Sequence, residues 1–309
     1  MRALYMHLII QMYVDLRNQF IITNKIKQME TTKNSLTYKL GNEFEINRLG
    51  YGAMQLSGFG VFGEVADREN AKQVLQTAVN AGVNFIDTAE AYGPKFNESL
   101  IADALHPYKS DLIIATKGGF NRTGPNQWIP NGKPESIKEN IEGSLKRLKV
   151  DTIDLWQLHR IDPKVPVEET LAPVLEAIKA GKIKHFGLSE VTIEQIEQVE
   201  KVLPVVSVQN MYNLGKRQWE NVLDYTAQRG IAFIPWFPLA SGPDSLAKKI
   251  NNIAEKHDAT VAQIALAWLL KRSPNILLIP GTKSISHLNE NLKAGDIELS
   301  DEEFAELSK

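Results

Sequence analysis

A short apolar run opens the segment Val83-Asn84-Phe85-Ile86-Asp87-Thr88-Ala89-Glu90-Ala91-Tyr92-Gly93. Such a run is typical of a strand that is buried on both faces of a sheet. The segment then becomes a loop that carries a carboxylate, Asp87, and a phenol, Tyr92. Ionisable groups directly after a buried strand make this strand exit a candidate functional site.

Two later segments repeat the arrangement. Residues 112–116 form an apolar run that ends at Lys117, and residues 152–158 form another that ends at His159. In a barrel of parallel strands, the C-terminal ends of the strands meet at the rim that carries the chemistry. The candidate catalytic residues are therefore Asp87, Tyr92, Lys117 and His159.

Strand-like and helix-like patterns alternate along most of the chain. We expect strands at residues 49–54, 83–86, 112–116, 153–158, 183–188, 205–209, 231–236 and 276–279. We expect helices at residues 67–81, 97–105, 134–148, 167–180, 193–202, 218–229, 245–256, 261–270 and 285–293. Eight such units in about 250 residues predict an α/β fold and fit a (β/α)8 TIM barrel better than an open sheet. Before the barrel, residues 36–40 and 43–46 alternate in polarity around Gly41-Asn42, which predicts a β-hairpin.

The composition is ordinary for a globular protein. The chain has 309 residues, of which 43% are hydrophobic and 23% charged, so it can form one large domain. A formal net charge of -2 gives no electrostatic reason to expect nucleic acid or a membrane as a partner. The absence of cysteine excludes disulfides and thiol catalysis and fits a reducing compartment, so we expect a cytoplasmic protein. The histidines share no metal-ligand spacing such as HxxxH, so we expect no metal site.

The first 35 residues differ from the rest of the chain. Residues 8–14 are apolar but too few to span a bilayer, and no clear small-residue cleavage site follows them. We therefore expect residues 1–35 to be a disordered or dispensable extension and residues 36–309 to form a single domain. Met29 lies just before the first regular pattern and is a candidate for the true start.

The four candidate residues suit the reduction of a carbonyl to an alcohol. That reaction needs a hydride from a cofactor, because no side chain can donate one, and a proton from a nearby acid. Tyr92 is the candidate acid, and an ammonium at Lys117 would lower its pKa by favouring phenolate. Asp87 would pair with Lys117, and His159 would hydrogen-bond the carbonyl as negative charge develops.

Each of these residues, taken alone, also has an ordinary structural explanation. An aspartate after a strand is usually a helix cap, a tyrosine packs with a satisfied hydroxyl, and a lysine is solvated. A histidine in an apolar run is more often a hydrogen-bonded core residue than a catalyst. Their occurrence on three successive strand exits favours the catalytic interpretation.

The four residues together resemble the catalytic set of the aldo-keto reductases, and the resemblance runs from about Leu40 to the C-terminus. It implies that the hairpin closes the bottom of the barrel. It also implies that Tyr92 is the general acid in reduction and the general base in oxidation. The expected activity is NADPH-dependent reduction of aldehydes or ketones, with a small carbonyl compound as the partner.

No GxGxxG fingerprint follows any expected strand, so a Rossmann site is not indicated. The aldo-keto reductases instead bind NADP in an extended form across the barrel mouth. By this resemblance, Ser189 and Gln209 contact the nicotinamide carboxamide and Trp236 stacks on the ring. A core aromatic is the alternative explanation for Trp236. The chain departs from the family at Glu190, where a carboxylate replaces the asparagine that usually follows Gly-Leu-Ser.

The last expected strand and helix suggest a phosphate site. The segment Ile279-Pro280-Gly281-Thr282-Lys283-Ser284 opens a helix, and a helix N-terminus suits a phosphate. Lys283 adds a cation suited to a 2′-phosphate, which favours NADP over NAD, whereas His287 stands where the family often has arginine. A capped surface helix with a solvated lysine is the alternative. The resemblance implies these cofactor-binding residues: Gly52, Ala53, Met54, Ser189, Gln209, Trp236, Pro238, Leu239, Gly281, Thr282, Lys283, His287, Glu290 and Asn291.

The walls of the substrate pocket must come from loops other than a long C-terminal one, because the chain ends about a dozen residues after Asp296. The candidates are Phe59, Phe62, the insert at residues 120–131 with Trp128, and Trp156 near His159. Packing of Trp128 within its own loop remains an alternative.

Within the family, the chain is most similar to the bacterial pyridoxal reductases. The shared motifs lie at residues 47–56, 105–108 and 273–282, which are framework and cofactor-side segments. Pyridoxal is therefore one candidate substrate among many aldehydes. Two other functions stay open: a redox sensor or regulatory subunit that binds NADP and turns over slowly, and a barrel enzyme that binds a sugar phosphate at residues 281–284.

Overall fold

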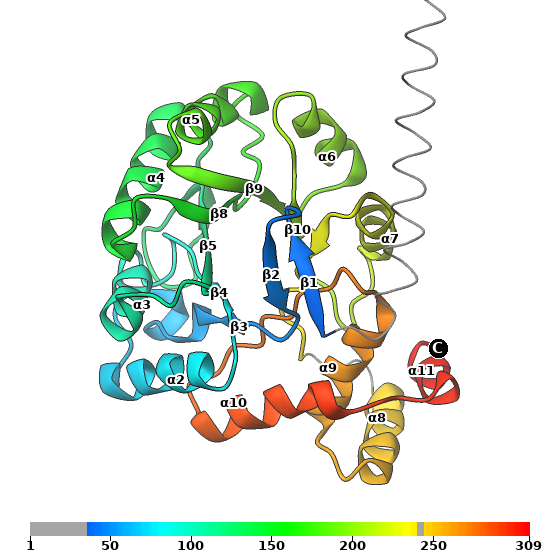
Figure 1. Ribbon diagram of the computed structural model, residues 1–309. Coiled ribbons are helices and arrows are strands. Elements are labelled where there is room, and N and C mark those ends of the chain that lie inside the picture. The colour runs from blue at the N-terminus through cyan, green and yellow to red at the C-terminus, as the bar shows by residue number, and fades with distance from the viewer. Residues whose placement is uncertain (1–35, 240–243) are drawn as a thin grey trace, which may run out of the picture. The chain divides into compact units, whose positions relative to one another are not determined.

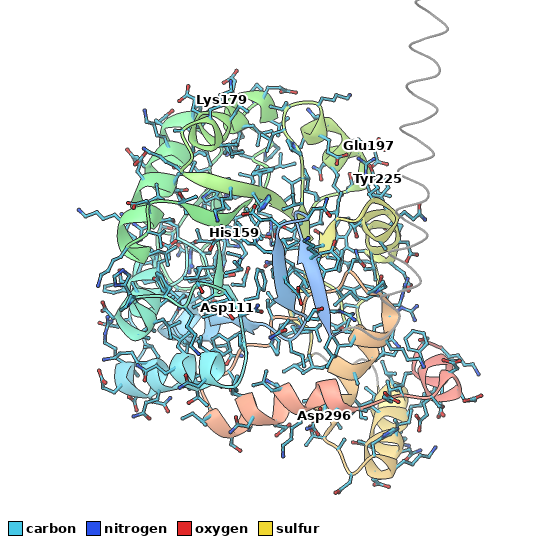
Figure 2. All side chains as sticks on the ribbon, in the orientation of Figure 1. Asp111, His159, Lys179, Glu197, Tyr225 and Asp296 are labelled. Atoms are coloured by element: carbon cyan, nitrogen blue, oxygen red, sulfur yellow. The ribbon has the colours of Figure 1, made fainter. Side chains whose placement is uncertain are left out.

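The computed structural model describes residues 36–239 and 244–309, and the expected extension at residues 1–35 lies outside the described residues. Within the described ranges, strands form an inner ring and helices surround it (Figure 1). Figure 2 places His159 inside this ring, whereas Lys179, Glu197 and Tyr225 lie on the helices outside it. No helix in the described ranges is long and apolar enough to cross a membrane.

The predicted N-terminal hairpin is present. Strands β1 (Thr37–Leu40) and β2 (Phe44–Asn47) pair antiparallel with Leu40 opposite Phe44. The turn between them has positive φ angles at Gly41 and Asn42, a conformation that these two residue types tolerate best. The sequence signal therefore identified both strands and the turn that joins them.

Seven parallel strands form the barrel sheet, in the order β11-β10-β9-β8-β5-β4-β3. They are β3 (Tyr51–Gly52), β4 (Phe85–Asp87), β5 (Ile113–Gly118), β8 (Ile153–Leu158), β9 (Ile183–Ser189), β10 (Ser207–Gln209) and β11 (Ala232–Phe233). The order follows the sequence, as expected for a (β/α)8 barrel.

The expected eighth strand at residues 276–279 appears only as isolated bridges. Ile276 pairs with Phe233 on one side, and Leu278 pairs with Leu49 on the other. The segment therefore joins both edges of the sheet and closes the barrel. The expected first strand is also shorter than predicted, because residues 53–55 turn into a 3-10 helix after β3.

The helices follow the strands as the periodicity predicts. They are α2 (Arg68–Asn80), α3 (Phe96–Leu105), α4 (Pro134–Leu148), α5 (Val167–Lys179), α6 (Ile193–Glu200), α7 (Glu220–Arg229), α8 (Asp244–Lys256), α9 (Val261–Arg272), α10 (Ile285–Leu292) and α11 (Asp301–Leu307). Asp67 caps α2 by accepting a hydrogen bond from the backbone N–H of Asn70, as predicted. Helix α11 was not predicted, although the Ser300 and Glu303 capping box marks its start.

The hairpin closes the bottom of the barrel. Leu40 and Ile46 are fully buried in the same cluster as Phe85 and Leu155 of the barrel interior. The Tyr38 hydroxyl donates a hydrogen bond of 2.8 Å to the carbonyl of Gly230, just before β11. The hairpin therefore covers the N-terminal ends of the strands and leaves their C-terminal ends free for a site.

The connection between β5 and α4 contains a small hairpin that was predicted only as a loop. Strands β6 (Phe120–Asn121) and β7 (Ile129–Pro130) pair antiparallel with Phe120 opposite Pro130. This hairpin carries two aromatic side chains, Phe120 and Trp128, and both line the cavity described next.

Candidate active site

Two neighbouring strands place a buried ion pair at the mouth of the barrel. Asp87 is the last residue of β4, and Lys117 lies near the end of β5. The Lys117 ammonium is 2.6 Å from Asp87 Oδ1, and it donates a hydrogen bond of 2.8 Å to the carbonyl of Thr88. Lys117 is fully buried, and such a charge requires a partner of this kind. The predicted pairing of Asp87 with Lys117 is present in the structure.

Two amides hold the second oxygen of Asp87. The Nε2 atoms of Gln209 and Gln157 donate to Asp87 Oδ2 at 2.9 Å and 3.3 Å. Gln157 was not predicted, yet a signal exists in the sequence. It lies two residues before His159 in a buried strand, and alternate strand residues face the same side. A polar residue in that phase points to the interior of the barrel.

The Tyr92 hydroxyl lies 3.4 Å from the Lys117 ammonium. Burial raises the pKa of Tyr92, and the charge of Lys117 opposes that increase without overcoming it. The expectation that Lys117 lowers the pKa of Tyr92 is therefore right about the contribution of the ammonium and wrong about the net direction. Burial also disfavours the charge of Lys117, but Asp87 and the Tyr92 oxygen outweigh that effect and raise the pKa of the lysine.

His159 follows β8 and faces Tyr92, with their ring centroids 5.9 Å apart. Its burial, together with the charges of Lys117, Arg160 and Arg122, lowers its pKa well below 6.5, so the imidazole is neutral. Its Nδ1 atom is buried and has no hydrogen-bond partner within the described ranges. The ring lines the cavity described next, so its other nitrogen, Nε2, is the one that can meet an oxygen there.

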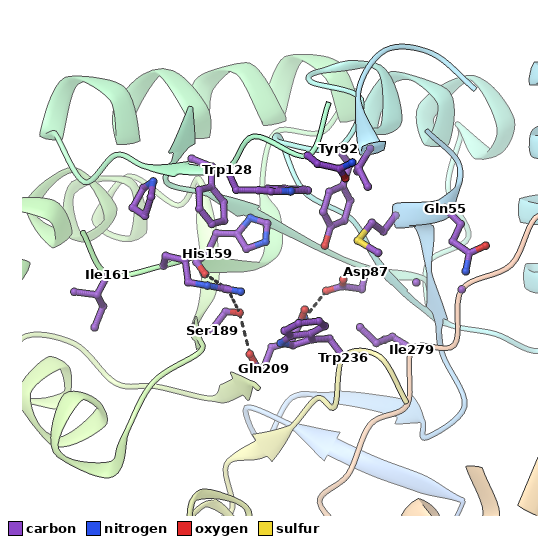
Figure 3. A pocket seen from close by; sticks show the side chains of 18 residues that line it. Gln55, Asp87, Tyr92, Trp128, His159, Ile161, Ser189, Gln209, Trp236 and Ile279 are labelled. Carbon is purple, nitrogen blue, oxygen red and sulfur yellow. Dashed lines mark hydrogen bonds between the residues drawn. The ribbon is translucent and has the colours of Figure 1, made fainter. Parts of the chain in front are cut away.

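Asp87, Tyr92, His159 and Gln209 line a cavity of about 670 Å³ (Figure 3). This volume is typical of a site for a small molecule. Its lining residues are Gly52, Met54, Gln55, Val61, Asp87, Tyr92, Phe120, Asn126, Trp128, Pro130, His159, Arg160, Ile161, Ser189, Gln209, Trp236, Ile279 and Gly281.

Aromatic rings form one wall of the cavity. The rings of Trp128 and Phe120 lie 6.1 Å and 4.6 Å from that of His159. The Arg122 guanidinium stacks 3.6 Å from the Trp128 ring. Trp128 therefore lines the cavity as predicted and does not merely pack within its loop. Arg122 and Phe120 were not singled out from the sequence, although both lie in the insert that was predicted as a wall.

Three of the predicted wall residues, Trp156, Phe59 and Phe62, do not line the cavity. Trp156 is fully buried and stacks on Phe186 at 6.1 Å, within the core between sheet and helices. Strand alternation explains this error, because Trp156 is out of phase with His159. Phe59 is 85% exposed, and Phe62 contacts Arg122 at 5.8 Å behind Trp128.

The predicted cofactor residues fall into three groups. Gly52, Met54, Ser189, Gln209, Trp236 and Gly281 line the cavity. Lys283 and His287 are exposed at the start of α10, where Ser284 caps the helix. Ala53, Pro238, Leu239, Thr282, Glu290 and Asn291 lie beside these groups without lining the cavity. Glu290 accepts a hydrogen bond from Thr260, which ties α10 to the start of α9.

Glu190, the departure from the family pattern, has a defined position. Its Oε1 atom accepts hydrogen bonds from the Trp236 indole at 2.7 Å and from the backbone N–H of Met211 at 2.6 Å. Its φ of 54° is in the left-handed region, which asparagine tolerates better than glutamate. The carboxylate therefore links two strand exits and orients the tryptophan that faces the cavity.

The cavity and the start of α10 together suit nicotinamide adenine dinucleotide phosphate (NADP). The cavity runs from Tyr92 and His159 past the Ser189 hydroxyl to Gly281, just before the N-terminus of α10. Exposed N–H groups and the cation of Lys283 at this helix suit a phosphate. Asn70 donates a hydrogen bond of 2.8 Å to the carbonyl of Lys283 and thereby fixes that turn.

A phenol, a buried ion pair and an uncommitted imidazole at the mouth of a parallel barrel suit the chemistry of a carbonyl oxidoreductase. Residues 48–309 match the model of the aldo/keto reductase family, and the chain belongs to this family. The predicted fold and family are thereby confirmed. As a member of this family, the chain is an oxidoreductase.

Individual relatives agree with the family assignment. An uncharacterized oxidoreductase of Schizosaccharomyces pombe is 49% identical over 88% of this chain and 89% of its own. Pyridoxine 4-dehydrogenase of Escherichia coli is 41% identical over 89% of this chain and 98% of its own. The crystal structure of an aldo-keto reductase from Klebsiella pneumoniae in complex with NADPH has a TM-score of 0.74 and 27% identity, over 88% of this chain and 93% of that one.

Proposed function

We propose that this enzyme reduces aldehydes with Tyr92 as the proton donor and His159 as the group that binds the carbonyl oxygen. The observation that carries the proposal is the position of the Tyr92 hydroxyl, 3.4 Å from the ammonium of Lys117 and next to an uncommitted imidazole. NADPH, when bound, supplies the hydride to the carbonyl carbon. The proton of the Tyr92 hydroxyl goes to the carbonyl oxygen, and the product is an alcohol.

The surroundings of Tyr92 suit this role. Proton transfer leaves a phenolate in a buried site, and the nearby Lys117 ammonium stabilises that charge. Asp87 holds the ammonium in place and is itself held by Gln157 and Gln209. Neutral His159 can donate a hydrogen bond to the carbonyl oxygen as negative charge develops there.

The cofactor residues support a position for NADPH between the aromatic wall and α10. Trp236 would stack on the nicotinamide, with Glu190 holding its indole. Ser189 and Gln209 would bind the carboxamide, and Lys283 and His287 would receive the 2′-phosphate. Gln209 Nε2 uses one of its two N–H groups on Asp87, so the second N–H and the side-chain oxygen are what Gln209 would offer the cofactor.

Pyridoxal is the candidate substrate that the relatives suggest. Pyridoxine 4-dehydrogenase of Escherichia coli is 41% identical to this chain over most of both. The aromatic wall of Phe120 and Trp128 suits a flat ring beside Tyr92 and His159. We therefore infer that aromatic aldehydes, pyridoxal among them, are preferred over aliphatic ones of the same size.

The test measures NADPH consumption with pyridoxal, 4-nitrobenzaldehyde and aliphatic aldehydes, for the wild type and for Tyr92→Phe. We expect kcat to fall by roughly 10²–10⁴-fold in Tyr92→Phe, because the proton donor is lost. NADPH binding, followed by quenching of tryptophan fluorescence, should remain. Quenching without turnover of any aldehyde by the wild type would instead favour a redox sensor. Full activity of the variant would overturn the role of Tyr92.

A further inference from the structure

The charged groups around the cavity differ in how completely they are hydrogen-bonded. Asp87 accepts from Lys117 and from two glutamines, and Glu190 accepts from an indole and a backbone N–H. Arg122, behind the aromatic wall, donates from all three of its nitrogens to backbone carbonyls. Arg160 lines the cavity and is the exception.

The guanidinium of Arg160 is only partly satisfied. A guanidinium has five N–H donors, and here Nη1 donates to the carbonyl of His159 at 2.5 Å and to the Ser189 hydroxyl at 3.0 Å. Within residues 36–239 and 244–309, its Nε and Nη2 atoms make no hydrogen bond, and no carboxylate lies within 4.0 Å of it. The half-buried guanidinium of Arg160 is thus held in one orientation by Nη1, and its Nε and Nη2 atoms form an edge that is free to bind a ligand.

Arg160 lies at the part of the cavity that His159 and the aromatic wall form. Arg160 follows His159 directly in the chain, and both line the same cavity. Its Nη1 atom donates to the His159 carbonyl and to the Ser189 hydroxyl, so the side chain reaches from the end of β8 to the end of β9. Its guanidinium carbon is 5.7 Å from the Phe120 ring, so the cation borders the aromatic wall.

We propose that Arg160 binds an anionic group of the substrate, so that this enzyme prefers aromatic aldehydes that carry a carboxylate or phosphate. A planar guanidinium with two adjacent free nitrogens matches the paired oxygens of either group. Because Arg160 directly follows His159 and both line the cavity, the anion would lie near the carbonyl that His159 binds. This inference rests on the proposed reductase activity, and it identifies the class of carbonyl compound for which the cavity is built.

The test compares matched substrates. We would measure kcat/KM for 3- and 4-carboxybenzaldehyde and their methyl esters, and for pyridoxal 5′-phosphate against pyridoxal. In the wild type we expect at least one anionic member to exceed its neutral partner by about tenfold or more, which corresponds to one hydrogen-bonded charge pair. In Arg160→Met the ratio of anionic to neutral substrate should fall to about one, and Arg160→Lys should retain part of it. Which pair shows the effect distinguishes a carboxylate from a phosphate.

Two controls separate the possible explanations. Arg229→Met removes the same charge from the end of α7, at the bottom of the barrel, and it should leave the ratio unchanged. Binding of 4-(hydroxymethyl)benzoate and its methyl ester, followed by tryptophan fluorescence in the presence of NADP, tests the anion site without turnover. A wild type that reduces the neutral aldehydes but shows no anionic preference would overturn the inference and leave the reductase function intact. If Arg160→Met instead weakened NADPH binding and kept the ratio, the arginine would serve the cofactor and the inference would be wrong.

Discussion

The two ends of the barrel treat buried charge in opposite ways. At the bottom, the Arg48 guanidinium is 3% exposed and donates to the backbone carbonyls of Leu270, Ser273 and Ile276. At the mouth, Lys117 is also buried, but one of its neighbours is a hydroxyl that can release a proton. The bottom uses a cation to join chain segments, whereas the mouth keeps cations beside groups that can react or bind.

The difference shows how one fold separates stability from chemistry. The hairpin fills the bottom with Leu40 and Ile46, whereas the mouth holds the cavity of about 670 Å³. The mouth contains His159 and Arg160, whose hydrogen-bonding capacity is not fully used. In a barrel enzyme, groups left unsatisfied at the C-terminal rim are the ones that meet a ligand.

The largest contrast should come from removing one cation at each end. Lys117→Met leaves the Asp87 carboxylate buried without its counter-ion, which should cost about 3–5 kcal/mol of stability. It should also reduce kcat by on the order of 10²-fold or more, because the phenolate loses its stabilising charge. Arg48→Met leaves carbonyls without donors, at about 1–3 kcal/mol for each buried group left unpaired, and it should not lower kcat of the folded fraction.

Urea unfolding followed by circular dichroism, together with kcat for each variant, measures both effects. Lys117→Arg provides the matched control, because it keeps the charge while changing its shape. The contrast between the two ends would fail if Arg48→Met lowered kcat as much as Lys117→Met, or if Lys117→Met were stable and active.

The pH dependence should report on the mouth alone. Burial raises the pKa of Tyr92 above 10, so the phenol stays protonated until the pH rises past that raised value. Burial lowers the pKa of His159 well below 6.5, so the imidazole stays neutral at pH 6.5 and above. We therefore expect kcat for reduction to be level between about pH 6.5 and 9. Alcohol oxidation needs the phenolate, so its rate should rise across the same range; a reduction rate that falls between pH 7 and 8 would contradict the roles proposed for these residues.

The smallest effect should come from Glu190, which acts through Trp236. Glu190→Gln replaces a charged acceptor by a neutral one, which weakens the hydrogen bond to the indole by about 1 kcal/mol and should raise the Kd for NADPH about fivefold. Glu190→Ala should have the larger effect, since it removes the acceptor. Fluorescence titration with NADPH measures both variants, and an unchanged Kd in Glu190→Ala would remove Glu190 from the cofactor site.

Local sequence patterns were sufficient for most elements. Pro134 at the first helical position and the apolar periodicity after it gave the bounds of α4, and the Gly41-Asn42 turn gave the hairpin. The expected strand at residues 276–279 was less accurate, because its bridges to Leu49 and Phe233 depend on closure of the barrel and not on local propensity.

The site was predicted in part. Asp87, Tyr92, Lys117 and His159 could be identified from the apolar runs before them. In the structure Asp87, Tyr92 and His159 line one cavity, and the buried Lys117 contacts the first two. Trp156 was assigned to that cavity by its closeness to His159 in the chain, and strand phase excludes it. The same phase rule, applied to the same strand, would have found Gln157.

The sequence by itself determined the alternation of strands and helices, the hairpin and the identities of the ionisable groups at three strand exits, because these depend on periodicity and on neighbouring residues. The tertiary structure alone decided which groups share hydrogen bonds. Glu190 reaches Trp236 across 46 residues, and Arg160 binds Ser189 while keeping an unpaired edge. Such contacts depend on how distant strand exits converge around the closed barrel, and no local pattern encodes that geometry.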